Sequence, residues 1–286
     1  MATALVTDST AYLPSDLVGD LDVRVVPLHV VVGGREHREG VDVTAAEVAA
    51  ALRSFTPVST SRPAPAAFLE AYEAAARAGA DSVVSVHISA ELSSTLGGAE
   101  LAAAEASVPV TVVDSRALGM VMGHAVLAGA RAAAAGADAA AVADLVRRTC
   151  EASSVVFYVD TLEYLRRGGR IGRAGALLGS ALSIKPILAL RDGHIVPLER
   201  VRTSSRAIAR IEELAVEAAE LAGPGGGVVD VAVHHLDSAE RADRLAERLA
   251  ARLPQATPRI VELGAVVGAH VGPGTLAVAV VPRLGD

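Results

Sequence analysis

The chain has 286 residues and a formal net charge of −7, and its residues are 51% hydrophobic but only 2% aromatic. A length of this order predicts about two domains. The acidic balance excludes a protein that depends on a broad basic surface, as nucleic-acid-binding proteins do, and the single cysteine, Cys150, excludes an internal disulfide. We therefore expect a cytoplasmic protein that binds no nucleic acid and builds its cores from Ala, Val, Leu and Ile.

Strands and helices alternate in the pattern of the first half. Short apolar runs predict strands at Ala4–Thr7, at Val23–Val32 (one or two strands), and at Ser82–His87, Val110–Val113 and Val155–Val159. Helices are predicted at Thr44–Arg53 behind a capping box, Ala66–Ala78 behind Pro65, up to Ala106, and at Met120–Ala135 and Asp138–Thr149. This alternation predicts a parallel sheet with helices on both faces.

The second half has a different pattern. Runs on either side of an Asp-Gly turn predict a hairpin, Ile184–Leu190 with His194–Arg200. Further helices are expected at Ser204–Leu221 and Ser238–Leu253, a glycine-rich loop at 224–227, and strands at Val228–His234, Arg259–Leu263 and Leu276–Val281. Fewer crossovers predict a mixed or antiparallel sheet, so we divide the chain into an N-terminal α/β domain, 1–159, and a C-terminal α/β domain, 160–286.

One uncharged run, Leu263–Pro282, is long enough to cross a membrane. Its many glycines and its Gly-Pro-Gly instead predict strand, loop and strand. The first ten residues, MATALVTDST, have neither the basic region nor the apolar core of a signal peptide. We expect no integral membrane association, although a transient membrane contact is compatible with the sequence.

Two hydroxyl-rich segments precede predicted helices. Thr60 and Ser61 come before the proline-started helix, and Ser93 and Ser94 follow the apolar strand Ser82–His87. Each pair can cap its helix or bind an anion at the helix N-terminus. Ligands of open α/β sheets bind beyond the carboxyl ends of the strands, so the two segments together favour an anion cradle.

Three other features are candidates for chemistry. His270, beside Gly-Pro-Gly, can donate to a carboxylate or can be a structural histidine. Asp8, after the first strand, can cap a helix or orient nearby hydroxyls. No Asp, Glu or His cluster has metal-ligand spacing, and no nucleophile elbow is present, so neither a metal nor a catalytic residue is expected.

The segment Asp160–Leu188 contains four arginines and Lys185, the only lysine. Its Gly168–Gly172 loop can be interpreted as a phosphate cradle, although such a glycine pattern is weak evidence alone. The arginines, Arg170 among them, can also form a basic patch at the rim of a site or a solvated helix face.

The chain resembles the DegV family through motifs that run in order along its whole length. These are VTDST with its following Leu-Pro, TSRPAP, SAELSST, VVDSRALGMVMG, FYVDTLEYLRRGGRI, LLGSALSIKPIL, the DGHI and RVRT hairpin, and HVGPGTLAV. The resemblance implies a two-domain α/β fold that holds one long-chain fatty acid, such as palmitate or oleate, between the domains. It also implies presentation of the fatty-acid carboxylate to a separate kinase subunit that forms an acyl-phosphate.

The resemblance also implies the site residues. The carboxylate contacts fall on Ser61 or Thr60, on Ser93, on the Ser94 backbone and on His270; Arg170 and Arg202 lie at the mouth, facing the partner, and Leu177–Ile187 walls the acyl tunnel. Arg62, Glu91 and Ser94 depart from the usual family pattern, which has glutamine at the first position and glycine at the others.

Our leading hypothesis is a lipid-binding carrier of fatty acid metabolism, without a catalytic centre or a cofactor of its own. One alternative is an enzyme that acts on a small phosphorylated or acyl substrate, with the Gly168–Gly172 loop holding phosphate and Asp8 in catalysis. A structural or regulatory partner protein is the other.

Overall fold

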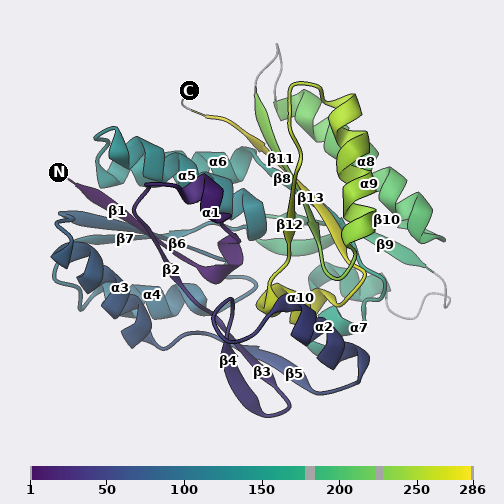
Figure 1. Ribbon diagram of the computed structural model, residues 1–286, viewed down its shortest axis with the longest axis horizontal. Helices are drawn as coiled ribbons and strands as arrows, with labels where there is room; N and C mark the ends of the chain where they lie inside the picture. The colour runs from purple at the N-terminus through teal and green to yellow at the C-terminus, as the bar shows by residue number, and fades with distance from the viewer. Residues whose placement is uncertain (1, 178–183, 223–227, 285–286) are drawn as a thin grey trace.

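The computed structural model describes residues 2–177, 184–222 and 228–284, and they form three sheets with helices around them (Figure 1). The predicted loop at 224–227 and most of the predicted tunnel wall at 177–187 lie outside the described residues.

The N-terminal sheet is parallel, as the alternating pattern predicts. Its strand order is β2-β1-β6-β7, with β1 at Thr3–Asp8, β2 at Val23–Val26, β6 at Ser82–His87 and β7 at Val110–Asp114. Helices cover both faces (Figure 1): α3 (Pro65–Arg77) and α4 (Thr95–Ala103) on one, α5 (Gly119–Ala134) and α6 (Ala139–Ala152) on the other. Alternate residues of β1 divide between the two cores, because Val6 packs with α3 and α4 whereas Leu5 packs with α5 and α6.

The larger sheet is mixed and has the order β10-β9-β8-β13-β11-β12. Its strands are β8 (Ser154–Tyr158), β9 (Lys185–Arg191), β10 (His194–Val201), β11 (Val229–His235), β12 (Arg259–Glu262) and β13 (Leu276–Pro282). Only β11 and β12 pair in parallel, and the predicted hairpin is β9 with β10. Helices α8 (Ser204–Ala222) and α9 (Ala239–Arg252) cover one face (Figure 1).

Strand β8 belongs to this larger sheet, although it precedes the predicted domain boundary after residue 159. Its neighbours β9 and β13 both lie beyond the boundary, so a division of the chain by sheets falls before Ser154. Helix α5 contacts both sheets, because Met120 and Val121 pack with Ala279 and Val281 of β13. The two halves therefore share a core.

A third, antiparallel sheet was not predicted. It has the order β4-β3-β5 and consists of β3 (His29–Val32), β4 (Arg35–Arg38) and β5 (Val58–Ser61). It packs against α2 (Ala45–Arg53), whose capping box between Thr44 and Glu47 is present, and against α10 (Ala265–Val271). Figure 1 shows this small sheet beside α2, α7 (Glu163–Arg167) and α10, where it adjoins both larger sheets.

Helix α10 also corrects a prediction. The segment after Leu263 was expected to be a loop, but residues 265–271 form a helix that ends at Gly272. The rest of the uncharged run includes β13, and no helix among the described residues has the length and apolarity to span a bilayer.

Candidate functional site

A cavity of about 190 Å³ lies where the three sheets meet, and we call it the inner cavity. It brings together all of the expected carboxylate contacts, together with Arg170. Its polar lining is Thr60, Ser61, Arg62, Ser93, Ser94, Arg170 and His270. Among the described residues of that lining, arginine is the only charged type, which suits an anionic ligand.

His270 lies near the C-terminal end of α10 and lines the inner cavity. Its Nε2 is 2.8 Å from Thr60 Oγ1 of β5, whereas its Nδ1 is buried and has no hydrogen-bond partner among the described residues. Burial and, to a lesser extent, the nearby charge of Arg170 lower the pKa of His270 to about 4. The imidazole is therefore neutral at pH 7, and it can donate one hydrogen bond without placing a second cation in the cavity.

The backbone of Gly168 faces Nδ1 of His270 so closely that an added Cβ would overlap the imidazole ring. We expect Gly168→Ala to displace His270 from Thr60 and to destabilise the protein by about 1–3 kcal/mol, because overpacking forces neighbouring side chains off their rotamers. Urea denaturation measures the loss, and the NMR signals of the His270 ring report its displacement. An alanine at Gly175, where an added Cβ meets only Ile171 in ordinary contact, is the control. Equal effects of the two substitutions would contradict this role.

Thr60 and Ser61 lie on β5 and not in a loop before a helix. The N-cap of α3 is Ala64 and has no side-chain cap, so the capping interpretation of these hydroxyls was wrong. Neighbouring residues of a strand point to opposite faces. Thr60 thus reaches His270, whereas Ser61 Oγ donates to Glu36 Oε1 at 2.9 Å.

Ser93 and Ser94 lie in the turn that leads from β6 into α4. Ser93 Oγ accepts from the Thr95 amide at 3.3 Å and is 2.8 Å from Thr95 Oγ1. Ser94 is the N-cap residue of α4 but makes no side-chain cap. Both residues line the inner cavity at the amino end of the helix, where an anion is favoured.

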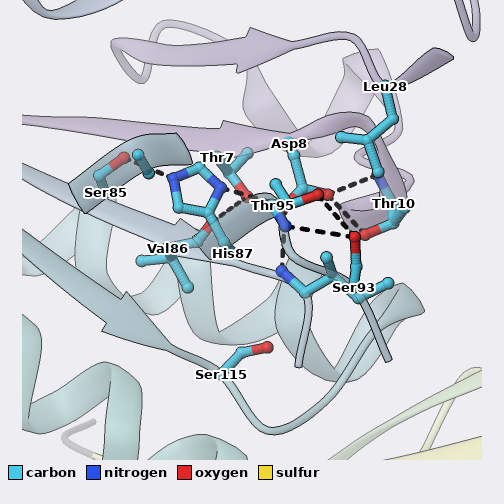
Figure 2. Close-up of polar contacts among 12 residues, drawn as sticks. Thr7, Asp8, Thr10, Leu28, Ser85, Val86, His87, Ser93, Thr95 and Ser115 are labelled. Atoms are coloured by element: carbon cyan, nitrogen blue, oxygen red, sulfur yellow. Dashed lines mark hydrogen bonds and ion pairs between the residues drawn. The ribbon is translucent and has the colours of Figure 1, made fainter. Parts of the chain in front are cut away.

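A buried polar network holds the start of this turn (Figure 2). Asp8 is fully buried and accepts hydrogen bonds from the Ile88 amide at 2.9 Å, from His87 Nδ1 at 3.1 Å, and from both the amide and the hydroxyl of Thr10. His87 Nε2 continues to Ser85 Oγ at 2.7 Å, and Tyr72 donates to that hydroxyl. Because these bonds occupy both carboxylate oxygens of Asp8, its role here is to fix the turn at Ile88, which lines the cavity.

The sequence missed this network, which has the Ser-His-Asp composition of a catalytic triad. Ser85 and His87 are separated by one residue on β6, and a pair at that spacing with Asp8 on the neighbouring strand was the available signal. Both side chains are fully buried, and neither lines the inner cavity. The network therefore supports the site from inside the N-terminal core.

Arg170 ties two lining segments together. Its Nε donates to the Leu92 carbonyl at 2.9 Å, and one terminal nitrogen donates to the Gly168 carbonyl at 2.7 Å. The amides of Gly168, Gly169 and Arg170 all donate to backbone carbonyls of α7. These three amides are therefore not directed at a ligand, which weakens the interpretation of Gly168–Gly172 as a phosphate cradle. Arg202 is exposed after β10 and does not line the inner cavity.

The inner cavity adjoins two other spaces. On one side is an almost wholly apolar pocket of about 50 Å³, which shares Leu118, Ile195, Val267 and Val271 with it. On the other side is an open cleft of about 650 Å³, which we call the outer cleft and which shares Thr60, Arg170 and His270 with it. The polar lining residues of the inner cavity thus lie between an apolar pocket and an open cleft. Among the described residues, no group of three His, Cys, Asp or Glu could hold a metal ion.

Comparisons with known proteins identify the family of this chain. The family model described as "Uncharacterised protein, DegV family" matches residues 2–283. A DegV domain-containing protein from Streptomyces coelicolor is 50% identical over 281 residues, which cover 98% of each chain. The chain belongs to the DegV family. The predicted family is therefore confirmed.

Solved DegV structures confirm the predicted fold as well. A DegV family protein from Thermus thermophilus, whose structure concerns fatty acid binding, is 37% identical with a TM-score of 0.90 and covers 99% of this chain and 100% of its own. DegV from Bacillus subtilis, a fatty acid binding protein, is 30% identical with the same TM-score and the same coverage of both chains.

Two departures from the DegV pattern now have a place in the structure. Arg62 lines the inner cavity and adds a second guanidinium to the lining that includes Arg170. Glu91 lies away from the cavity lining, and its carboxylate is 3.7 Å from His194 Nδ1 of the β9–β10 hairpin. The first departure changes the charge around a ligand, whereas the second changes how the turn meets the larger sheet.

Proposed function

We propose that this protein binds one long-chain fatty acid, such as palmitate or oleate, in the inner cavity. The carboxylate lies against Thr60, Ser93 and His270, with Ser61 and Ser94 beside it, and the acyl chain extends toward the apolar pocket. The observation that carries the proposal is the neutral His270, which meets the Thr60 hydroxyl through Nε2 and lines the polar end of an apolar space together with Ser93. The DegV proteins of known structure that bind fatty acids support it.

The binding energetics of a fatty acid fit a site with a polar end for the carboxylate and an apolar space for the acyl chain. A buried carboxylate is costly unless it is hydrogen-bonded, and hydroxyls, a helix N-terminus and an imidazole supply the bonds. Burial of about fifteen methylenes contributes a gross ~12 kcal/mol, of which the loss of chain freedom offsets a large part. The acyl chain therefore dominates the affinity, and the polar group sets the orientation.

We further infer that the carboxylate is presented to a separate fatty acid kinase in the cytoplasm. The outer cleft gives access to Thr60 and His270, and its only charged lining residues among those described are Arg167 and Arg170. Two guanidinium groups beside a carboxylate would attract a phosphoryl donor. The protein itself then acts as a carrier, and Arg202 belongs to the surface that faces the kinase.

Mass spectrometry of the purified protein under denaturing conditions tests the binding step. We expect it to release a fatty acid of about 14–18 carbons, since a chain of that length supplies the methylene burial on which the affinity depends. A ligand-free protein that also fails to bind oleate and palmitate would contradict the proposal.

Phe55 offers a test of the partner-facing role. It lies at the rim of the outer cleft, is 84% exposed, and has the left-handed backbone conformation (φ 57°) that usually selects glycine after a helix. We expect Phe55→Gly to raise the free energy of unfolding by roughly 0.5–1 kcal/mol and to lower acyl-phosphate formation by the cognate kinase. Chemical denaturation and a coupled kinase assay measure the two effects.

The matched control for Phe55 is Leu221→Ser on α8, because Leu221 is 81% exposed and does not line the outer cleft. It should leave acyl-phosphate formation unchanged. Full activity of the Phe55 variant would show that this rim does not contact the kinase.

A further inference from the structure

Helix α10 supplies four lining residues of the inner cavity, namely Val266, Val267, His270 and Val271. The position of this helix therefore decides where the imidazole lies. Its N-cap, Gly264, has no side chain to cap the helix. The contact that replaces a cap comes from Glu39, which follows β4 and is more than 200 residues away in the chain.

Glu39 joins α10 to the opposite wall of the cavity. Its Oε1 accepts from the Val266 amide at 2.8 Å, and its Oε2 accepts from Ser9 Oγ. Ser9 Oγ in turn accepts from the Leu28 amide at 3.0 Å, and Leu28 lines the inner cavity. A Cβ at Gly264 would overlap Glu39 Oε1, so the absent side chain is what admits the carboxylate.

The link from Leu28 to Val266 has room for a single proton between Ser9 and Glu39. When Glu39 is ionised, Ser9 donates to it, and every polar atom of the link has a partner. When Glu39 is protonated, only one of the two hydroxyl hydrogens can lie between the oxygens, so the other donor has no acceptor within the link and the bond to a charged acceptor is lost. Protonation thus weakens the hold on α10.

The surroundings of Glu39 raise its pKa, so that it gains and loses its proton near neutral pH. Glu39 is only 5% exposed, and no cation forms an ion pair with it among the described residues. The titratable groups that face it are Asp8 and Tyr12, and Asp42, Glu47 and Glu262 line the adjoining cleft. Burial is the main cause that raises the pKa of Glu39 to about 7. His270, with a pKa of about 4, does not change its charge in the same range.

We propose that Glu39 is a positioning residue for the inner cavity, which sets the place of His270 through α10 and makes the retention of the ligand depend on pH. The inference rests on the proposed fatty-acid site, since retention is what it regulates. The fatty acid is held more tightly when Glu39 is ionised and dissociates faster when it is protonated.

The test compares the wild-type protein with Glu39→Gln, which mimics the protonated acid, and with Glu47→Gln as the control. Glu47 lines the same cleft, but its contacts are those of the α2 capping box. Transfer of bound oleate to serum albumin is followed between pH 8 and 6. We expect the wild-type and Glu47→Gln proteins to release oleate on the order of tenfold faster at pH 6, and Glu39→Gln to release it at the faster rate throughout. A pH dependence of Glu39→Gln equal to that of the wild-type protein would overturn the inference.

A second readout needs no lipid and separates this inference from the proposed function. The amide NMR signal of Val266 should titrate with a midpoint near 7 in the wild-type protein and not in Glu39→Gln. Absence of any bound oleate would refute the proposed function, whereas the Val266 titration would still test the contact. A Val266 signal that does not titrate in the wild-type protein would refute the contact itself.

Discussion

Replacement of His270 by alanine is expected to accelerate the loss of bound fatty acid by roughly 10–100-fold, because a hydrogen bond to a charged group contributes about 1.5–3 kcal/mol. The substitution removes the imidazole that we propose as a donor to the carboxylate, and it leaves Thr60 Oγ1 without its partner. The loss should appear in oleate retention after gel filtration and in the yield of acyl-phosphate. Thermal denaturation of the ligand-free protein should show a loss of roughly 1–3 kcal/mol, because Thr60 Oγ1 loses its partner, so oleate retention is compared well below the unfolding transition.

His235 provides the control for this experiment. It is a buried histidine of β11 whose Nδ1 also has no described partner, and it lines neither the inner cavity nor the apolar pocket. His235→Ala should therefore retain oleate as the wild-type protein does. If both variants lose oleate equally, the effect belongs to the fold, and His270 has no particular part in binding the carboxylate.

The elements that could be predicted from the sequence are those with a local hydrophobic pattern. Apolar runs of strand length, such as Ser82–His87, identified strands of the two larger sheets, because burial on both faces leaves a continuous hydrophobic signal. In the third sheet β3 lies in the predicted apolar run Val23–Val32, but the other two strands carry no such signal. Strands β4 (Arg-Glu-His-Arg) and β5 (Val-Ser-Thr-Ser) are mostly polar, and pairing with β3 makes them strands.

Local sequence patterns were also insufficient to predict the structure of α10 and the sheet that β8 joins. Glycines and a Gly-Pro-Gly resemble loop residues, yet residues 265–271 form a helix because their apolar side chains pack against α2 and the third sheet. The strand pattern of Val155–Val159 was recognised, but no local feature tells which sheet a strand joins. A prediction from one sequence therefore placed the boundary at residue 159.

The site residues divide in a similar way. Hydroxyls and a histidine beside turn residues are visible in the sequence, and the structure brings Thr60, Ser93 and His270 to one cavity. Glu39 gives no such signal, since it lies in a charged run, Arg-Glu-His-Arg-Glu, that is typical of an exposed surface. Its burial depends on β4, Ser9 and α10 meeting at one point, which only the tertiary structure reveals.

The apolar pocket should determine the length of the acyl chain. Ala277 of β13 lines it, and Ala277→Leu is expected to fill most of its 50 Å³ and to exclude about four terminal carbons. At about 0.8 kcal/mol for each methylene that is no longer buried, the affinity for an 18-carbon acid falls on the order of 100-fold. A 12-carbon acid is shorter than the roughly 14 carbons that would still be accommodated, and it should bind as before. Native mass spectrometry of the protein, incubated with saturated acids of graded length, measures this preference.

Ala279, two residues further along β13, is the matched control. It is also buried, but it packs against α5 in the core that the two sheets share and does not line the pocket. Ala279→Leu should destabilise the protein, because it adds volume to a packed core, without shifting the preferred chain length. A shift caused by both substitutions would mean that the acyl chain runs toward α5. No shift from Ala277→Leu would mean that it leaves the inner cavity by another route.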